Sequence, residues 1–589
     1  MRILRWLWYL IVGAFALVGA FVVLSIVGLA LLWRDITLPS EPMPDTAVLQ
    51  LDLREPIVEA EPLKLPVIGP IERRLAMHEL IDGIYAAAED ERVTGLLARI
   101  NGTPLGLAQI EEIRTAIAAF RGTGKPAVAF AETFGEGGDG TLEYYLASAF
   151  GEVWLQPSGE VAMTGLRLEM PFLRSMLADL GIRAEFSARE DYKSAADMFV
   201  RDQMSPAHRR NLEMLVRSWM TQIAGDIATA RGLEPGEVQD LIDRAPLSAD
   251  VAEEAGLIDR QGYRDDAERS VRDAGADAPF YAFEDYARQV DPPADAPAVA
   301  LLYGFGPIHL GEGSGDGFST SDMGADTIVA ALRQARETED IVAVVLRLDS
   351  PGGSYVASDT IWQEVRRTRE AGLPVVVSMG NVAASGGYFI AAPADAIVAD
   401  RTTITGSIGV LSGKFVLEGL WADLDIGWDG VGFGANADMY SPNQPFTEAQ
   451  WLKLEETLDR IYEDFLQRVA DGRGMERNAV RDVAQGQIWT GSDALERGLV
   501  DELGGLRTAI SVALEAAGYS REIDYRLVPV RGEEIEFDGM LGDIEAGIAA
   551  LHDAARLMSK IGAWLETGET VTGGPALRFD PPAPAPTQP

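Results

Sequence analysis

The chain has 589 residues, of which 47% are hydrophobic, and this is enough for two or more domains with full cores. Acidic residues outnumber basic ones by 91 to 50, so the formal net charge is −41 and we do not expect nucleic acid as a partner. The sequence has no cysteine, and its four histidines are not spaced as a zinc motif. We therefore expect neither thiol catalysis nor a metal site.

The N-terminal segment predicts a membrane anchor at residues 1–34. Residues 6 to 33 are 28 uncharged residues, which as a helix would extend about 42 Å and cross a hydrocarbon core of about 30 Å. Because Arg2 and Arg5 precede this run, we expect the N-terminus in the cytoplasm and everything after Arg34 outside it. The alternative is a cleaved signal peptide, but the run is long and lacks a small-residue cleavage site. We therefore expect a single-pass protein of the inner (cytoplasmic) membrane whose bulk lies in the periplasm.

Most of the chain consists of one unit that occurs twice. "RVTGLLARING" resembles "DIVAVVLRLDS", "GKPAVAF" resembles "GLPVVVS", and "MLADLGI" resembles "LWADLDI", at offsets between 244 and 248 residues. The sequence predicts a stalk at 35–48, a first repeat at 49–290, a linker at 291–298, and a second repeat at 299–530. Residues 531–589 follow as an amphipathic helix of unknown role and a disordered tail.

Each repeat alternates apolar runs rich in β-formers with helical segments. In the second repeat, "IVAVVLRLD" is typical of a strand buried on both faces of a sheet. The segment "SYVASDTIWQEVRRTREAG" indicates an amphipathic helix that ends at Gly372, and "LPVVVSMG" indicates the next strand. This order predicts tandem α/β domains with parallel strands and right-handed crossovers.

Two strand-to-helix turns of the second repeat are candidates for a site. "DSPGGS" ends one predicted strand and "ASGG" ends the next, and the carboxyl ends of parallel strands are where α/β folds place their sites. Ser385 is a candidate nucleophile. The N–H of Gly352 or Gly353, together with that of Gly386, could form an oxyanion hole. The alternatives are an ordinary tight turn and a serine that only caps a helix.

The first repeat lacks both turns. Its SPGG position reads "NGTPLG", and the position of Ser385 falls near Thr141 in "GDGTLEYYLASA". Two copies that share a fold but differ at this point indicate that the difference is functional.

The sequence offers no suitable histidine to accept the proton of Ser385. It has six lysines among its 50 basic residues, and lysine, unlike arginine, can lose its proton. Lys193 lies in "REDYKSAADMF", and the second repeat has no lysine at the matching position. Lys414 is the alternative base, and either lysine could instead be an ordinary surface cation.

The motifs "SPGGS", "MGNVAASGGYFIAAPAD" and "TGSIGV", with "YKSAADMFVRDQMSP" upstream, resemble the signal peptide peptidase A family in its long, two-repeat form. The resemblance extends from the anchor to about residue 510. It implies that Ser385 is the nucleophile, that Lys193 is the general base, and that Ser407 of TGSIG orients this lysine. It also implies tandem Clp-protease/crotonase-like domains and a bowl-shaped homo-oligomer, which we expect to be a tetramer.

We therefore expect a membrane-anchored Ser/Lys endopeptidase, with no metal or cofactor, that degrades cleaved signal peptides and other apolar peptides. One alternative is a crotonase-type acyl-CoA enzyme, which would share the fold and the oxyanion hole but would use carboxylates and a cytosolic cofactor. The other is an inactive membrane scaffold, and the intact ASGG and YKS motifs argue against it.

Overall fold

The computed structural model describes residues 42–60, 74–102, 104–290, 292–313 and 322–530. All of them belong to one compact unit. The predicted anchor at 1–34 and the predicted helix and tail at 531–589 lie outside the described residues. Among the residues that are described, no helix combines the length and apolar character that crossing a membrane would need.

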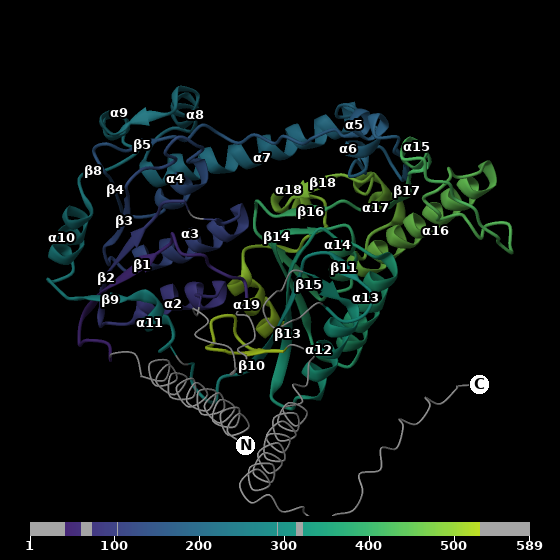
Figure 1. Cartoon of the computed structure of the whole chain (residues 1–589). Coiled ribbons are helices and arrows are strands. Elements are labelled where there is room, and N and C mark those ends of the chain that lie inside the picture. The colour runs from purple at the N-terminus through teal and green to yellow at the C-terminus, as the bar shows by residue number, and fades with distance from the viewer. Residues whose placement is uncertain (1–41, 61–73, 103, 291, 314–321, 531–589) are drawn as a thin grey trace, which may run out of the picture. The chain divides into compact units, whose positions relative to one another are not determined.

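The first repeat folds around a six-stranded parallel sheet with the strand order β8-β4-β3-β2-β1-β9 (Figure 1). Its elements are β1 (Ala47–Asp52), α2 (Met77–Glu89), β2 (Val93–Arg99), α3 (Leu107–Gly122), β3 (Ala127–Ala131), α4 (Thr141–Ala147), β4 (Glu152–Leu155), β5 (Glu160–Val161), α5 (Arg174–Asp179), β6 (Arg183–Ala188), α6 (Asp197–Val200), α7 (Pro206–Arg231), α8 (Pro235–Arg244), β7 (Leu247–Ser248), α9 (Ala249–Glu254), β8 (Arg260–Gln261), α10 (Arg264–Ala274), β9 (Phe280–Ala282) and α11 (Phe283–Ala287).

The second repeat has the same core, with the strand order β19-β15-β14-β13-β10-β20 and an extension from β14 through β16 to β18. Its elements are β10 (Ala298–Phe305), β11 (Ile308–His309), β12 (Met323–Gly324), α12 (Ala325–Glu337), β13 (Ile341–Ser350), α13 (Tyr355–Glu370), β14 (Val375–Ala384), α14 (Gly386–Ala391), β15 (Ala396–Ala399), β16 (Ile404–Gly406), β17 (Leu411–Val416), α15 (Glu418–Asp423), α16 (Glu448–Arg473), α17 (Arg477–Val483), β18 (Ile488–Thr490), α18 (Gly491–Glu496), β19 (Glu502–Leu503), α19 (Leu506–Ala516) and β20 (Arg526–Pro529).

Strand β13 shows why the apolar runs become central strands. Its alternate side chains belong to two different buried clusters: Val344 and Leu346 pack in the main core of the repeat, and Val345 packs in the cluster that includes α19. The strand is therefore covered on both faces, as the sequence predicts. The following helix α13 ends at Glu370, and Gly372 follows with a positive φ of 91°, which a glycine adopts without strain.

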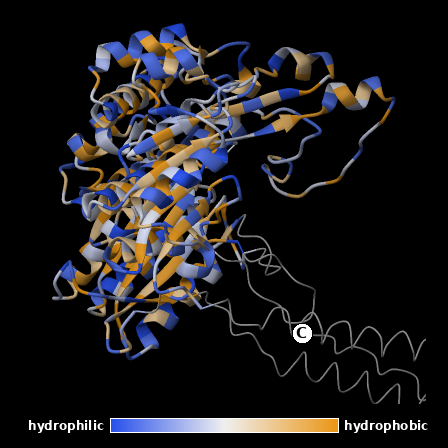
Figure 2. Ribbon diagram, turned by 90° about the vertical axis from the view of Figure 1, so that its left-hand side faces the viewer, coloured by the Kyte–Doolittle hydropathy of each residue, from blue (hydrophilic) through white to orange (hydrophobic). Residues whose placement is uncertain are grey.

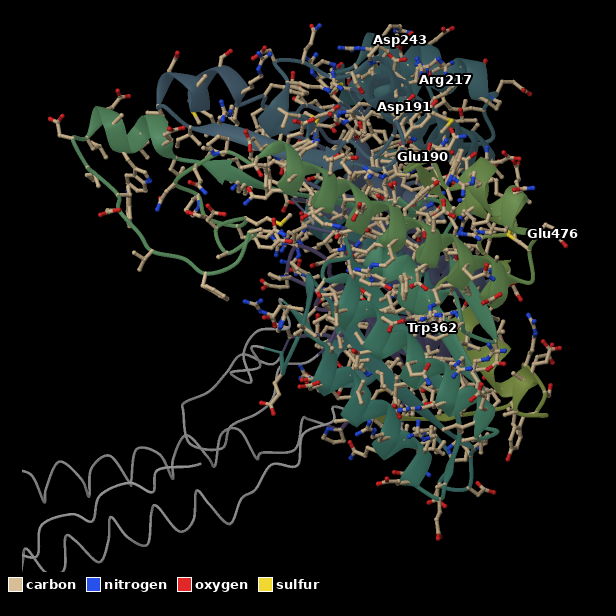
Figure 3. The ribbon with its side chains drawn as sticks, turned by 90° about the vertical axis from the view of Figure 1, so that its right-hand side faces the viewer. Glu190, Asp191, Arg217, Asp243, Trp362 and Glu476 are labelled. Carbon is tan, nitrogen blue, oxygen red and sulfur yellow. The ribbon has the colours of Figure 1, made fainter. Side chains whose placement is uncertain are left out.

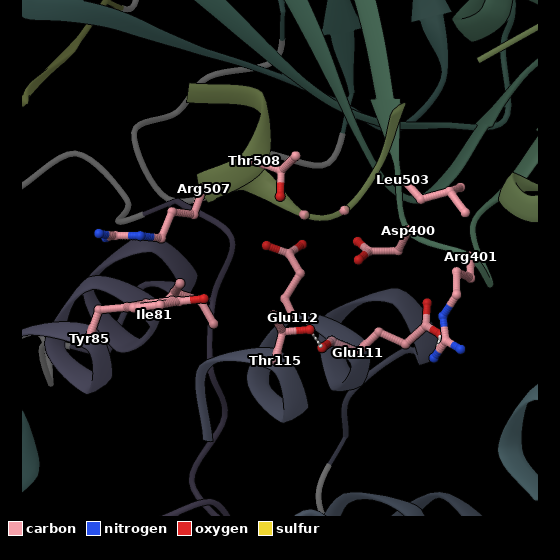
Figure 4. Close-up of a pocket in the computed structure, with 12 residues that line it drawn as sticks. Ile81, Tyr85, Glu111, Glu112, Thr115, Asp400, Arg401, Leu503, Arg507 and Thr508 are labelled. Carbon is pink, nitrogen blue, oxygen red and sulfur yellow. Dashed lines mark hydrogen bonds and ion pairs between the residues drawn. The ribbon is translucent and has the colours of Figure 1, made fainter. Parts of the chain in front are cut away.

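Buried ion pairs hold the two repeats together. Arg347, on β13, has no exposed surface, and its guanidinium donates to Glu59 at 3.1 Å and to Glu112 of α3 at 2.6 Å. Figure 4 shows Glu112 with Asp400 around a neighbouring cavity of about 220 Å³. Burial raises the pKa of both carboxyl groups. Because removing one partner would leave a buried charge without compensation, this network favours a single docking of α3 on the second repeat.

A two-stranded antiparallel sheet makes a second connection between the repeats. Strand β6 of the first repeat pairs with β17 of the second, with Ala188 opposite Leu411 and Arg183 opposite Val416. In Figure 2 this strand pair projects from the remainder of the described chain together with a long loop. The loop that follows β6 carries Lys193, so the strand pairing brings that residue to the second repeat.

Candidate active site

Ser385 lies at the turn between β14 and α14, in an unusual backbone conformation. Its φ is 55° and its ψ is −117°, a region that residues other than glycine seldom adopt. Hydrogen bonds on both sides hold the turn: the Ser385 N–H donates to the Gly406 carbonyl at 2.8 Å, and its own carbonyl accepts from the Phe389 N–H at 2.9 Å. The side chain makes no capping hydrogen bond to α14, so the alternative of a serine that only caps the helix is wrong. A strained turn of this kind exposes the hydroxyl at the end of a strand.

Lys193, from the first repeat, reaches this hydroxyl. Its Nζ lies 3.0 Å from Ser385 Oγ, 2.7 Å from the carbonyl oxygen of Ser407 and 2.9 Å from Ser407 Oγ. The structure therefore brings together the three residues that the sequence singles out, which come from two repeats. Lys193 and Ser385 are 192 positions apart in the chain.

The two acceptors on Ser407 determine how a neutral lysine would be oriented. A neutral amine has two N–H donors and one lone pair, whereas an ammonium has three donors and no lone pair. If Ser407 accepts both N–H groups, the lone pair points to the remaining neighbour, the hydroxyl of Ser385. This arrangement is suited to transfer of a proton from Ser385 to Lys193.

Burial lowers the pKa of the Lys193 amine from its ordinary value of 10.5 to about 7. The residue as a whole is half-buried, but its amine end is enclosed by protein, and burial alone produces the shift. Two glycines of the second repeat allow Lys193 to approach closely. A Cβ at Gly486 would lie 2.4 Å from the backbone nitrogen of Lys193, and a Cβ at Gly409 would lie 3.2 Å from the side-chain Cδ of Lys193. At pH 7 about half of such amines are neutral, against roughly one in three thousand at the ordinary pKa.

The two glycine turns lie against each other at the site. A Cβ at Gly352, which has a φ of 97°, would be 2.5 Å from the Gly386 nitrogen and 2.8 Å from Ser385 Cβ, so this position admits only glycine. The Gly352 N–H donates to Ser350 Oγ at 3.2 Å. The Gly386 N–H begins helix α14 and has no acceptor within that helix. The Gly353 N–H takes no part in the bridge to Ile308, which uses the Gly352 carbonyl and the Ser354 N–H.

In the first repeat Gly140 directly precedes α4 as Ser385 precedes α14, and Thr141, near which the sequence places the counterpart of Ser385, is the next residue. Thr141 is fully buried, and its hydroxyl is bound to Asp139 at 2.6 Å and to the Gly165 N–H at 3.0 Å. These contacts occupy the hydroxyl and fix the turn. The first repeat therefore lacks an accessible hydroxyl at this position.

The alternative base, Lys414, lies on β17 and bonds elsewhere. Its Nζ donates to the backbone carbonyls of Met439 at 2.8 Å and Ser441 at 2.9 Å, and it lies 4.2 Å from the centre of the Phe446 ring. Histidine is also engaged at other places among the described residues, as in the buried contact of His208 with Asp197. Neither residue competes with Lys193 for the hydroxyl of Ser385.

Several supporting contacts lack a signal in the sequence. The loop at residues 485–487 encloses the lysine: the Tyr192 N–H donates to Gln485, and the Ser407 N–H donates to Gln487. Asp349, near the end of β13, links that strand to the end of β14, because its carboxylate accepts from the backbone N–H groups of Asn381 and Val382. For Asp349, its position just before SPGG could have suggested a role, whereas nothing in "AQGQIW" indicates contact with Lys193.

Comparison with known proteins defines the class to which this fold and site belong. Residues 119–277 and 367–520 match peptidase family S49, one match in each repeat. "Protease 4" of Salmonella typhi is 31% identical over 486 residues, which cover 80% of this chain and 77% of that protein. "Serine protease SPPA, chloroplastic" of Arabidopsis thaliana is 29% identical over 86% of this chain and 74% of its own length. A shorter Enterococcus faecium protein, provisionally named signal peptide peptidase SppA, is 35% identical over 32% of this chain and 54% of its own length.

The chain belongs to peptidase family S49 and is a serine peptidase. The family membership and the long relatives bear out the resemblance that the motifs indicate. They favour the peptidase over both alternatives, the acyl-CoA enzyme and the inactive scaffold.

The low pKa of Lys193 predicts a pH-dependent effect on stability. With a native pKa of about 7 and an ordinary value of 10.5, the unfolded chain binds a proton between these pH values that the native protein lacks. Wild-type stability should therefore rise as the pH is raised from 7 towards 10.5, and the cost of burying the charge should be fully present below pH 7. We expect Lys193→Met to melt a few degrees above the wild type at pH 6, with a gain that shrinks through this window, in thermal unfolding followed by circular dichroism.

Lys193→Met also loses the hydrogen bonds to Ser407. This loss changes the free energy of unfolding by the same amount at every pH, so it does not alter the dependence of the gain on pH. Lys453→Met, at an exposed lysine of α16, serves as the control and should show no such trend. A gain for Lys193→Met that stays constant from pH 6 to pH 10 would show that the native amine has an ordinary pKa.

Proposed function

We propose that this peptidase works through a dyad in which Ser385 is the nucleophile and Lys193 the general base. The observation that carries the proposal is the 3.0 Å contact between Lys193 Nζ and Ser385 Oγ, made by an amine whose pKa is about 7. A base with a pKa near the working pH combines a large neutral fraction with useful basicity. In this proposal Ser407 is a positioning residue, because it holds the two N–H groups of the neutral amine.

The reaction begins when Ser385 Oγ attacks the carbonyl carbon of the peptide bond and its proton passes to Lys193. The N–H groups of Gly353 and Gly386 stabilise the negative oxygen of the tetrahedral intermediate, and that of Gly352 joins them if it leaves Ser350 Oγ. The ammonium of Lys193 then protonates the leaving amine as the C–N bond breaks. Water, deprotonated by the same lysine, hydrolyses the ester that remains on Ser385.

We further propose that the substrates are cleaved signal peptides and other apolar peptides, and that the enzyme acts as a membrane-anchored homo-oligomer. The motif resemblance and the name of the Enterococcus faecium relative support the substrate class. The 28-residue uncharged run and the arginines before it support an anchor with the peptidase part outside the cytoplasm. No metal or cofactor enters the proposed reaction.

Removing the nucleophile should abolish activity and leave the fold intact. We expect Ser385→Ala to lose all measurable cleavage of a synthetic apolar signal peptide, while its melting temperature stays close to that of the wild type, because the hydroxyl caps no helix. Thr141→Ser, at the matching position of the first repeat, should retain activity. Wild-type turnover in Ser385→Ala would show that another group attacks the peptide.

Replacing the base with a permanent cation separates a chemical role from a structural one. Because guanidinium stays protonated, we expect Lys193→Arg to be as inactive as Lys193→Ala, whereas Lys414→Arg stays active. The rate of the wild type should rise about tenfold per pH unit below 7 and level off above it, since only the neutral amine accepts the proton. Substantial cleavage by Lys193→Arg would instead place the base elsewhere.

The proposed topology can be tested on cells. Protease added to intact spheroplasts should degrade all of the chain beyond the anchor, because the positive-inside rule leaves only the short N-terminus in the cytoplasm. A cytoplasmic marker protein should stay intact in the same sample. Complete protection of the chain until the cells are lysed would contradict the proposed orientation.

A further inference from the structure

Helix α7 carries a buried amide beside strand β18, which follows the loop that encloses Lys193. Asn211 lies in the second turn of α7 and is only 4% exposed. Asparagine is a poor helix former, and burying its amide costs free energy unless the polar groups find partners. Both groups find them on one residue: Asn211 Nδ2 donates to the Ile488 carbonyl at 2.8 Å, and the Ile488 N–H donates to Asn211 Oδ1 at 2.9 Å. The side chain of Asn211 thus binds the backbone of Ile488 as a neighbouring strand would.

Ile488 is the first residue of β18, which lies at the edge of the extended sheet. It is opposite Gly406 of β16 in an antiparallel ladder. Alternate residues of an edge strand direct their N–H and C=O groups away from the sheet, so these groups need a partner from outside it. Asn211 is that partner for Ile488. It therefore fixes the point at which the loop at residues 485–487 enters β18.

The loop at residues 485–487 determines the surroundings of the Lys193 amine. The Ser407 N–H donates to the Gln487 carbonyl at 2.6 Å, and Ser407 binds the amine through its own carbonyl and its hydroxyl. Gly486 packs directly against the backbone of Lys193. A displacement of the start of β18 would therefore move both the residue that orients the amine and the glycine that encloses it.

The first repeat supplies this amide, as it supplies the lysine. Helices α7 and α16 are counterparts in the two repeats, each with 26 residues and a serine or threonine as N-cap. Six residues after the N-cap, α7 has Asn211, whereas α16 has Lys453, which is exposed and paired with Glu456. The buried amide is therefore a feature of the helix that lies against β18 and not of the repeated fold.

Burial alone lowers the pKa of the Lys193 amine, so the closeness of this enclosure determines how readily the amine loses its charge. Glu190 and Asp191, labelled in Figure 3, belong to the same loop as the lysine but are exposed. The other charged groups on the surrounding elements are bound elsewhere: Arg189 to Glu455 and Asp459, Asp197 to Arg201 and His208, and Arg210 over the ring of Tyr192. A looser enclosure should therefore raise the pKa of Lys193 without any contribution from a neighbouring charge.

We propose that Asn211 is a positioning residue for the peptidase reaction, because its amide holds Ile488 and keeps the loop at residues 485–487 closed over the Lys193 amine. This inference rests on the proposed dyad of Ser385 and Lys193. Asn211 acts through the loop and not on the reacting atoms. Without its two hydrogen bonds, water reaches the amine and favours the charged form, so the neutral base becomes scarce near pH 7. A higher pH should restore the neutral amine and with it the rate.

The pH dependence of kcat/KM tests this role in the full-length chain. We expect Asn211→Leu to cleave a synthetic apolar signal peptide about tenfold more slowly than the wild type at pH 6, but within about twofold of it at pH 9.5. A rise of about one unit in the pKa of Lys193 lowers the neutral fraction tenfold only at pH values below that pKa. An unchanged midpoint of the pH profile, with or without a uniform loss of rate, would overturn the inference.

Ser218→Ala is the matched control for this experiment. Ser218 Oγ lies 3.1 Å from Thr490 Oγ1, so this variant also removes a hydrogen bond between α7 and β18, but at the other end of the strand. It should keep the midpoint of the wild type. A shift as large as that of Asn211→Leu would show that any loosening of α7 has this effect, and would overturn the specific role of Asn211.

A stability measurement tests the same point without catalysis. The gain in melting temperature that Lys193→Met gives at pH 6 reports the cost of burying the charged amine. We expect this gain, and its decrease towards pH 10, to be smaller in the Asn211→Leu background, because water already reaches the amine. Asn211→Ala, which leaves room for a water on the two Ile488 groups, should behave in the same way and replaces Asn211→Leu if that variant does not fold.

The outcomes of this measurement separate the inference from the proposed function. A gain from Lys193→Met that is as large in the Asn211 variants as in the wild type would overturn the positioning role and leave the dyad intact. A wild type in which Lys193→Met gives no pH-dependent gain would instead contradict the neutral lysine of the dyad, and the role of Asn211 would fail with it.

Discussion

The site depends on one contact between two repeats: the amine of Lys193 against the hydroxyl of Ser385. The contact is useful only if the amine is neutral, and burial is what lowers its pKa to about 7. Neither repeat could provide that burial alone, because the lysine belongs to the first repeat and its enclosing groups, Ser407 and the loop around Gly486, belong to the second. To keep the Lys193 amine shielded from water, the two repeats must therefore dock rigidly.

Two structural features meet that requirement in different ways. The β6–β17 pairing fixes the register of the loop that carries Lys193, since backbone hydrogen bonds allow only discrete shifts. The buried network of Arg347, Glu59 and Glu112 restricts the angle between the repeats, because a shifted helix α3 would leave a charge without its partner. Such a network contributes more to a unique geometry than to net stability, since desolvation offsets much of the attraction between its charges. Because Arg347 is a residue of β13, the network also restrains this strand, which ends at the SPGG turn.

The sequence predicted the parts of this arrangement that depend on local pattern or on residue type. Burial on both faces gives β13 its continuous apolar run, and Gly372 ends the following helix, so both were predictable. Ser385 and Lys193 stood out by chemistry, because few side chains can act as a nucleophile or as a neutral base. The β6–β17 pairing, the Arg347 network and the bond from the Gly352 N–H to Ser350 could not be predicted, because they depend on long-range packing that leaves no periodic pattern.

The duplication also explains why the two halves of the site could be lost in complementary places. When two copies of one fold are joined in one chain, a Lys–Ser contact between them needs the lysine from one copy only and the serine turn from the other only. The first repeat has a buried threonine, Thr141, bound to Asp139 near the position of the serine turn, and the second repeat has Ala437 where the offset of 437 − 193 = 244 places the counterpart of Lys193. Neither difference alters the contact between Lys193 and Ser385.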